Sequence, residues 1–551
     1  MPRSGPSPPD ESGTPLALPR DVHSSLHCAA IAGAAARLVE VQVDLSLGLP
    51  GFYLVGMPDH ACIDAKVRVL TALRNSGYQL PQKKITVNLA PGDLRKEGAA
   101  FDLAIALGVL ASSGLLPPDR MLKALVVGEL ALSGDLLPVR GVLPIALEAQ
   151  RLGFTALIAP EPNAPEGALA QGLQVFGARS LAEAADIISG ASSRAPSPPA
   201  EPVSPAPYPV DLSDVRGQQS CKRALEIAAA GGHNALLIGP PGSGKTMLAR
   251  RMPTLLPALS FEEAVETTSI WSVAGRLRPG QGFLSERPFR APHHTISVAG
   301  LIGGGSPPRP GEISLAHNGV AFLDELPEFG RTALEALRQP LEDGEVSVVR
   351  ASGSAVMPAR FMLLGAMNPC PCGHASDPDP ERCRCTIVGK DVYLRRMSGP
   401  ILDRFDLHIE ARALATPDLL GLPQGDTSAQ VRERVERARA VQRRRGVHCN
   451  AQLRGRTLRE LCGATEKARG FLAGYVEMGR LSARSHDRVL KLARTIADLE
   501  NSELVHEEQI QEASELRCLD KPVSGRDPRS SLDLARERVT RKPRREHEQA
   551  V

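Results

Sequence analysis

The chain has 551 residues, of which 42% are hydrophobic and 23% charged, as in folded globular proteins rather than fibres or disordered chains. This length predicts about three to five domains. Only 3% of the residues are aromatic, which argues against a long surface of stacked rings for single-stranded nucleic acid. No apolar run reaches the ~18–20 residues of a membrane span and no signal peptide is recognised, so we expect a cytoplasmic protein without a membrane partner.

The formal net charge of +3 is unevenly distributed along the chain. Residues 521–551 hold nine Lys or Arg and five Asp or Glu, so this tail carries +4 and the remainder −1. We expect a disordered tail, and contacts to nucleic-acid phosphates are the alternative role for its charge.

The order of segments predicts a multidomain α/β protein. Strands are expected at 38–45 and 84–89, where apolar residues alternate, and a helix at 101–110. The clearest boundary is a stretch rich in Pro, Ser and Ala. The predicted units are a disordered N-terminus (1–20), a mixed α/β domain (21–190), a linker (191–209), a parallel α/β core (210–413), a helical domain (414–520) and the basic tail (521–551).

The strongest motif is a phosphate-binding loop. An apolar run at 235–238 precedes it and a helical pattern follows it, as the motif requires. Backbone N–H groups of such a loop surround phosphates, the lysine reaches the β- and γ-phosphates, and the threonine hydroxyl binds Mg²⁺. The G-x-x-x-x-G-K-[ST] pattern is matched by Gly239, Pro240, Pro241, Gly242, Ser243, Gly244, Lys245 and Thr246.

Polar side chains follow two further apolar runs. Asp324 and Glu325 come directly after residues 319–323, and Asn368 follows residues 361–367. Ligands bind at the carboxyl ends of parallel strands, so these groups are expected beside the loop. We expect Asp324 to hold Mg²⁺, Glu325 to act as general base towards water, and Asn368 to orient that water.

These strand ends together resemble the AAA+ ATPases. The resemblance makes Asn368 sensor 1, and it makes Arg404, in the run 398–406, an arginine finger that reaches a neighbour's nucleotide. Arg484, at the start of an expected helix, resembles sensor 2. A finger acting in trans implies a ring, usually of six copies. Surface salt bridges are the alternative role for both arginines.

Further stretches are similar to the YifB/ComM family of magnesium-chelatase-like AAA+ ATPases. They include 287–295, 301–305, 310–319, 337–342 and 402–406 in the core, and 48–59, 75–77 and 85–98 before it. The resemblance covers about residues 21–515. It implies a Lon-protease-like (ribosomal S5 domain 2-like) α+β N-terminal domain, an AAA+ core and a C-terminal helical lid. The implied activity is that of a hexameric, ATP- and Mg²⁺-dependent DNA helicase that promotes branch migration in natural transformation, alongside recombination proteins.

Lon-type proteases cut with a Ser–Lys dyad, and this chain lacks both groups. Position 100, where the resemblance expects the serine, is Ala100, and no lysine follows in 142–146. We therefore predict no peptidase activity. Ser112 and Ser113 are the nearest remaining hydroxyls.

Four cysteines fall within one short window, in the pattern C-x-C-x₁₀-C-x-C. Four soft ligands suit structural Zn²⁺, although C-x-C is shorter than the usual C-x₂₋₄-C. Reduced thiols and disulfides remain alternatives. The candidate ligands are Cys370, Cys372, Cys383 and Cys385.

Two other features concern a DNA motor. Residues 345–350 and 354–360 predict a hairpin that projects into a ring's pore, where Arg350 would grip phosphate, and a hairpin packed on the core is the alternative. His293 and His294 are adjacent, so we expect their side chains to diverge. Two other functions remain open: a chelatase-type ATPase that drives metal insertion into a tetrapyrrole, and an ATP-regulated scaffold or chaperone adaptor.

Overall fold

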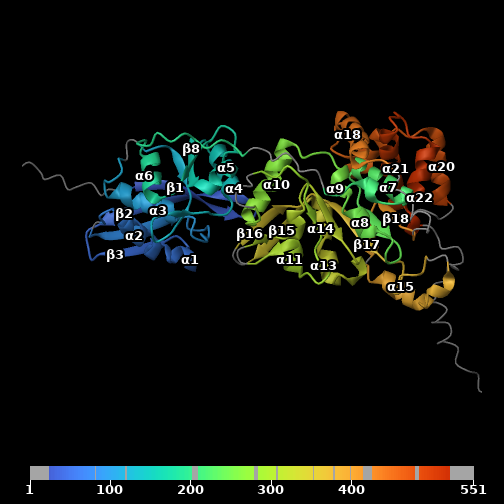
Figure 1. Ribbon diagram of the computed structural model, residues 1–551, viewed down its shortest axis with the longest axis horizontal. Helices are drawn as coiled ribbons and strands as arrows, with labels where there is room; N and C mark the ends of the chain where they lie inside the picture. Colours follow the sequence, from blue (N-terminus) through green and yellow to red (C-terminus); the bar gives the residue numbers. More distant parts are fainter. Residues whose placement is uncertain are drawn as a thin grey trace, which may run out of the picture.

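The computed structural model describes residues 24–80, 82–117, 121–200, 209–277, 283–305, 308–350, 353–376, 379–397, 399–413, 425–477 and 483–520. The predicted disordered N-terminus and the basic tail lie outside these ranges. Three units follow one another along the long axis of the molecule: an N-terminal α/β unit, a central α/β core and a helical unit (Figure 1). Within the described part of the chain, no helix has both the length and the apolar character that crossing a membrane requires.

The N-terminal unit is built on a seven-stranded mixed sheet in the order β3-β4-β2-β1-β5-β8-β9. Burial alternates along β2, the strand expected at 38–45. Helix α3 is apolar on all sides and buried along its whole length, because it packs between the sheet and neighbouring helices. The strands are β1 (Ser24–Ala32), β2 (Ala35–Ser46), β3 (Gly51–Val55), β4 (Lys84–Ala90), β5 (Ala124–Val126), β8 (Ala156–Pro160) and β9 (Gln174–Ala178), with the small pair β6 (Glu129–Leu130) and β7 (Leu136–Leu137). The helices are α1 (His60–Ile63), α2 (Ala65–Asn75), α3 (Asp102–Ser112), α4 (Val142–Arg151), α5 (Ala164–Gly167) and α6 (Leu181–Ile188).

The core contains a five-stranded parallel sheet in the order β11-β14-β17-β10-β18, which confirms the expected parallel α/β arrangement. Strands β10, β14 and β17 are buried at every residue, as expected for a sheet covered on both faces. The strands are β10 (Ala235–Ile238), β11 (Phe289–Arg290), β14 (Val320–Leu323), β17 (Met362–Met367) and β18 (Leu407–Glu410), with the pair β12 (Gly303–Gly304) and β13 (Arg309–Pro310) outside the sheet. The helices are α7 (Gln219–Gly231), α8 (Lys245–Ala249), α9 (Met252–Leu255), α10 (Phe261–Val273), α11 (Val298–Ile302), α12 (Glu312–Leu315), α13 (Arg331–Ala336), α14 (Arg338–Asp343), α15 (Ile387–Arg395) and α16 (Gly399–Leu402).

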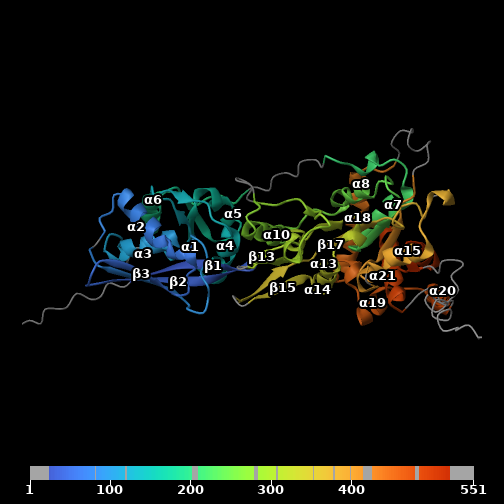
Figure 2. The ribbon, with the colours of Figure 1, turned by 90° about the horizontal axis from the view of Figure 1, so that it is seen from below.

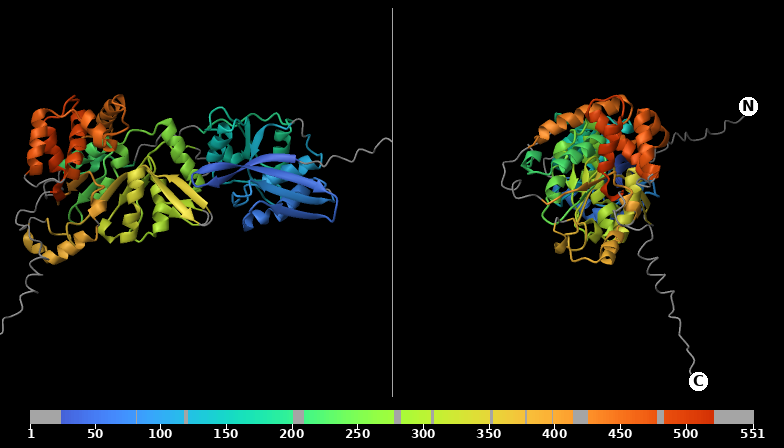
Figure 3. Two further views of the ribbon diagram at one scale, coloured as in Figure 1. Left: turned by 180° about the vertical axis from the view of Figure 1, so that it is seen from behind. Right: turned by 90° about the vertical axis from the view of Figure 1, so that its right-hand side faces the viewer.

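The predicted hairpin is formed by β15 (Glu345–Arg350) and β16 (Gly353–Pro358), which pair antiparallel. Its inward residues Val346 and Val348 belong to the buried core cluster, and Met357 is also fully buried. Its strand β16 meets the β1–β2 turn of the N-terminal unit (Figure 3). There, a Cβ atom on Gly33, whose φ is +68°, would stand 2.9 Å from the carbonyl oxygen of Val356. The hairpin is therefore packed on the core, and the side chain of Arg350 lies outside the described part.

Helix α10 joins the core to the N-terminal unit (Figure 2). An apolar cluster that includes Leu143, Leu169, Ala264 and Phe283 fills the contact. Beside it, the backbone N–H of Gly141 donates to the Ser272 hydroxyl (3.1 Å), and that hydroxyl donates to the buried Glu166 carboxylate (3.4 Å). The two units therefore share a packed, hydrogen-bonded interface.

The segment predicted as a linker is only partly separate from the N-terminal unit. The N–H of Ser197 donates to the carbonyl of Val175 (2.7 Å), and the N–H of Ala200 donates to that of Pro165 (3.1 Å). Arg194 pairs with Glu161 and Glu183. Residues 191–200 thus run along this unit, and residues 201–208 lie outside the described part.

The helical unit comprises α18 (Ser428–Arg444), α19 (Gly455–Leu461), α20 (Glu466–Glu477), α21 (Ala483–Leu499) and α22 (Glu507–Glu515). Helices α18 and α21 pack on α7, so one hydrophobic cluster spans the core and this unit. The fully buried ring of His233 lies at this junction. Its Nδ1 is 3.1 Å from the Asp406 carboxylate before β18, and its Nε2 is 2.8 Å from the Thr495 hydroxyl of α21.

Candidate nucleotide-binding site

The phosphate-binding loop connects β10 to α8, as its sequence predicts. Gly242 and Gly244 have φ values of +77° and +85°, a left-handed conformation that glycine adopts without steric cost. Gly239 is needed for a different reason: a Cβ there would lie 2.0 Å from the carbonyl oxygen of Ala411, which follows β18. The glycines therefore allow the turn and its close approach to the neighbouring strand end.

Lys245 is oriented by groups on both sides of the loop. Its Nζ donates to the carbonyls of Gly239 (2.8 Å) and Pro240 (2.9 Å) and to Oδ1 of Asn368 (3.3 Å). Burial lowers the pKa of this ammonium, and the nearby carboxylate of Asp324 opposes the shift. The side chain predicted to bind phosphate thus directly contacts the amide predicted to orient water.

Thr246 and Asp324 meet although 78 positions separate them in the chain. The Thr246 hydroxyl donates to Oδ2 of Asp324 at 2.6 Å. Asp324 leaves the end of β14, and its Oδ1 accepts the N–H of Glu325 (3.0 Å). A hydroxyl and a carboxylate at this separation form an oxygen ligand set that suits Mg²⁺ with a bound nucleotide phosphate. The residues present therefore fit a magnesium–nucleotide complex.

The order of the strands explains why Asn368 joins this group. Strand β17 lies between β10, which carries the loop, and β14, which carries Asp324. Asn368 follows directly after β17, so its amide emerges between the other two strand ends. Three separate segments therefore converge at one edge of the sheet.

Glu325 lies at the solvent-exposed edge of the site formed by Lys245, Thr246, Asp324 and Asn368. Its backbone is left-handed, with φ +52°, and its side chain is 60% exposed. Nδ1 of His294 lies 3.4 Å from Oε2 of Glu325. The carboxylate is thus accessible to water and held by one histidine.

The expectation that the two adjacent histidines diverge is wrong. The ring centroids of His293 and His294 are 4.1 Å apart, tilted by 34°. The segment before α11 is a turn rather than a helix or strand, so adjacent side chains need not alternate. Nδ1 of His293 lies 2.9 Å from the Thr295 hydroxyl, while His294 faces Glu325 and the ring of Phe329.

Of the two arginines predicted as site residues, the structure describes the side chain of Arg404 but not that of Arg484. Arg404 forms an ion pair with Glu342 of α14, and Asn234 donates to its backbone carbonyl (3.0 Å). Its side chain is 22% exposed. Arg484 lies in the first turn of α21, and its side chain is outside the described part.

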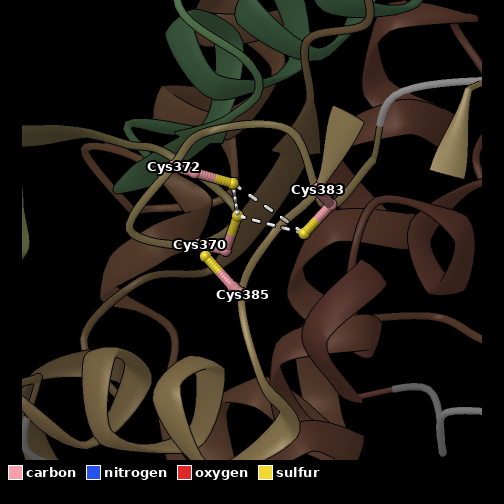
Figure 4. A group of neighbouring side chains, drawn as sticks. All are labelled: Cys370, Cys372, Cys383 and Cys385. Atoms are coloured by element: carbon pink, nitrogen blue, oxygen red, sulfur yellow. Dashed lines mark hydrogen bonds between the residues drawn. The ribbon is translucent and has the colours of Figure 1, made fainter. Parts of the chain in front are cut away.

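The four cysteines lie immediately beyond Asn368, on the segment between β17 and α15. Their Sγ atoms all fall within 4.8 Å of one another (Figure 4). The structure thus gathers all the predicted thiols into one cluster.

In the N-terminal unit, the segment similar to the Lon active-site region has structural roles. Ser112 is buried and its hydroxyl donates to the carbonyl of Val43 (2.9 Å), and the Ser113 hydroxyl donates to that of Leu110 (2.9 Å). The buried Asp102 accepts hydrogen bonds from Arg68. These side chains stabilise α3 and its surroundings.

Sequence reasoning did not identify His294 or Tyr393 as site residues. His294 approaches Glu325 from a turn before α11. Tyr393 of α15 lies beside the backbone of Asn368, which opposes the burial that raises the pKa of this phenol to about 12. No local motif marks either residue, because both contacts arise from the tertiary fold.

Comparison with known proteins agrees with this geometry. The chain matches the family descriptions "Magnesium chelatase, subunit ChlI" over residues 211–419, "Subunit ChlI of Mg-chelatase" over 41–163, and "Magnesium chelatase, subunit ChlI C-terminal" over 425–517. The described elements of all three units fall largely within these matches.

Relatives extend over most of the chain. It is 44% identical to the uncharacterized protein YifB of Escherichia coli strain K12, covering 90% of this chain and 97% of that protein. It is also 44% identical to the competence protein ComM of Haemophilus influenzae, covering 88% of this chain and 96% of that protein. A partial similarity, 27% identity, links 34% of this chain to Lon protease 2 of Bacillus subtilis. The chain belongs to the YifB/ComM family of magnesium-chelatase-like ATPases.

Proposed function

We propose that this protein is an ATP-hydrolysing ring motor acting on DNA, a branch-migration helicase that serves recombination during natural transformation. The observation that carries the ATPase part is the convergence of Lys245, Thr246, Asp324 and Asn368 at one sheet edge. The DNA part is supported by the family resemblance and by the name of one relative, a competence protein.

In this proposal the site residues divide the work of hydrolysis. Lys245 binds the β- and γ-phosphates, and the Thr246 hydroxyl and Asp324 carboxylate hold Mg²⁺. Glu325 accepts a proton from the attacking water, with its carboxylate oriented by His294. The Asn368 amide fixes the position of that water. Mg²⁺ supplies charge neutralisation on the phosphates when it is bound.

Arg404 completes the site of a neighbouring copy in a homohexamer. In the single chain, Glu342 holds its guanidinium, an arrangement that keeps the cation oriented until a neighbour's phosphate replaces the carboxylate. An arginine suits this exchange because its planar fork binds carboxylate and phosphate alike. Arg484 of the helical unit serves as the second arginine sensor.

The remaining features of the proposal concern location and partners. The motor works in the cytoplasm on branched or single-stranded DNA that passes through the ring, together with recombination proteins. Aromatic residues are scarce, so the grip on DNA rests on phosphate contacts rather than base stacking. The cysteine cluster would hold a structural zinc ion that takes no direct part in ATP hydrolysis.

A second candidate is a chelatase-type subunit that drives metal insertion, which the family descriptions favour. Its ATPase residues would be the same. ATPase rates measured with and without forked DNA, together with strand displacement, separate the two. Turnover that rises with DNA and disappears in Lys245→Ala and Glu325→Gln supports the motor. ATPase turnover that is active but indifferent to DNA rejects it in favour of the chelatase or a scaffold.

A further inference from the structure

The sulfur atoms of the cysteine cluster have the spacing of a tetrahedral metal site. Sγ of Cys370 lies 3.4 Å from that of Cys372 and 3.9 Å from that of Cys383, and the latter two are 3.8 Å apart. With Zn–S bonds of about 2.3 Å, the edges of a regular ZnS₄ tetrahedron measure about 3.8 Å. A disulfide requires about 2.05 Å, so none of these three separations corresponds to one.

Local backbone structure explains how the short C-x-C spacing reaches this geometry. The N–H of Gly373 donates to the carbonyl of Cys370 (3.0 Å), and the φ of Gly373 is +84°, so the chain reverses directly after the first pair. The second pair lies just before α15, whose first turn is capped when the Thr386 hydroxyl accepts the N–H of Gly389 (3.0 Å). A tight turn and a helix start therefore present the two pairs to each other.

The surroundings of the cluster suit a bound ion. Cys370 is fully buried, whereas Cys372, Cys383 and Cys385 are partly exposed. The cluster is therefore shielded on one side and open to the entry of an ion on the other. Soft sulfur ligands select zinc over the hard Mg²⁺ of the nucleotide site.

The cluster also touches the nucleotide site at two points. A Cβ on Gly373 would lie 2.5 Å from Cδ of Pro241, so the turn rests directly on the phosphate-binding loop. One proline separates Asn368 from Cys370, and Tyr393 of α15, the helix that follows the second cysteine pair, lies beside the backbone of Asn368. The four cysteines therefore join the two ends of a segment that begins at Asn368 and leads into α15, which lies beside Asn368.

We propose that Cys370, Cys372, Cys383 and Cys385 bind one Zn²⁺ ion, and that this ion clamps the segment that positions Asn368 and Pro241. The zinc is structural, because four protein ligands leave no open coordination position. Its effect on hydrolysis is indirect, through the position of the loop and of the Asn368 amide. The metal assignment is independent of whether the motor acts on DNA.

The metal itself is tested on the purified full-length protein without any activity assay. Elemental analysis is expected to give one zinc ion per chain. Titration of the folded wild-type protein with a mercurial should release this zinc, which a colorimetric chelator then measures. Cys372→Ser and Cys383→Ser should each lower the zinc content at least fivefold, while Cys518→Ser, a cysteine outside the cluster, should retain it. A chain that has four titratable thiols and takes up no added Zn²⁺ overturns the site, and stoichiometric iron overturns the choice of metal.

The clamp is tested by a variant that keeps all four ligands. Gly373→Ala pushes a methyl group against Pro241 and is expected to retain zinc while the ATPase kcat falls about tenfold. Far-UV circular dichroism shows that the fold is kept. Zinc is then removed from the wild-type protein with the mercurial, and the mercurial is removed with excess thiol. This zinc-free protein should have a lower ATPase turnover and should regain the original turnover when Zn²⁺ is added back. Zinc removal that leaves kcat unchanged overturns the clamp but not the site.

Discussion

Nδ1 of His294 lies 3.4 Å from Oε2 of Glu325, so the carboxylate proposed as general base is held by a side chain from a separate turn. The left-handed backbone of Glu325 directs its side chain outward, where it is 60% exposed. An exposed carboxylate loses orientation readily, and general-base catalysis depends on its reach to water. We therefore propose His294 as a positioning residue for Glu325.

Removal of that contact should slow hydrolysis without weakening nucleotide binding. For His294→Ala we expect kcat to fall about tenfold, with the KM for ATP unchanged, because Lys245 and Thr246 are untouched. Steady-state kinetics measure both parameters. His60→Ala, an exposed histidine of the N-terminal unit, is the matched control. A rise in KM at constant kcat would show that His294 contributes to binding and does not orient Glu325.

The contact between the Thr246 hydroxyl and Asp324 predicts a dependence on magnesium. Asp324→Asn keeps the shape but removes the charge that holds the ion, so we expect turnover at saturating ATP to fall about a hundredfold and the half-saturating Mg²⁺ concentration to rise. Titration of ATPase rate against Mg²⁺ is the measurement. Asp343→Asn, at the exposed end of α14, should behave as the wild type. An unchanged magnesium curve in Asp324→Asn contradicts the assignment.

Arg404 allows a test of action between copies. Arg404→Ala should lower the ATPase rate about a hundredfold. Arg331→Ala, at a side chain that is 80% exposed, is the control and should keep the wild-type rate. Lys245→Ala is also expected to be inactive. Mixed rings of the two inactive variants regain activity only where an intact loop meets an intact arginine from its neighbour. If mixed rings assemble, as shown by sedimentation, and stay inactive, Arg404 does not act in trans.

The interface between the N-terminal unit and the core should depend on pH. Burial raises the pKa of Glu166 to about 7, against hydrogen bonds from Asn163 and Ser272 that favour its ionised form. The folded protein thus holds a proton that the unfolded chain releases near pH 4.5. The contribution of this group to the free energy of unfolding is fully present below pH 4.5. It is lost as the pH rises from there to about 7, and above about pH 7 no further change occurs.

Glu166→Gln removes this titration while keeping an amide that forms hydrogen bonds. We expect the variant to be more stable than the wild type at pH 8, by up to roughly 3 kcal/mol, with the difference shrinking towards pH 5. Thermal unfolding at both pH values measures it. Glu433→Gln, at a side chain 71% exposed, should show no such pH-dependent gain. An equal gain at both pH values would indicate a packing effect instead.

Local patterns predicted the parts of the site that depend on local chemistry. The glycines of the loop and the acids after β14 are fixed by what phosphate and Mg²⁺ require, so the sequence located them. The parallel sheet also followed from buried apolar runs. Asn368 was expected beside the loop because it follows a buried strand, but its direct contact with Lys245 depends on the strand order, which is a property of the whole sheet.

Contacts between distant segments were beyond sequence reasoning. The histidine pair was mispredicted because the rule of alternating directions applies to regular elements, and this segment is a turn. The pairing of Arg404 with Glu342 and the packing of residues 191–200 on the N-terminal unit both depend on tertiary structure. For the cysteines, the short C-x-C spacing counted against a metal until the turn at Gly373 showed how the pairs converge.

The buried ring of His233 has a mechanical consequence. It joins Asp406, before β18, to Thr495 of α21, and the adjacent Asn234 binds the carbonyl of Arg404. A rotation of the helical unit therefore cannot leave the segment around Arg404 in place without breaking buried hydrogen bonds. In the ring proposed above, a lid movement driven by the nucleotide in one copy would therefore pull on the arginine presented to the next copy, so that hydrolysis in successive subunits would be coupled rather than independent.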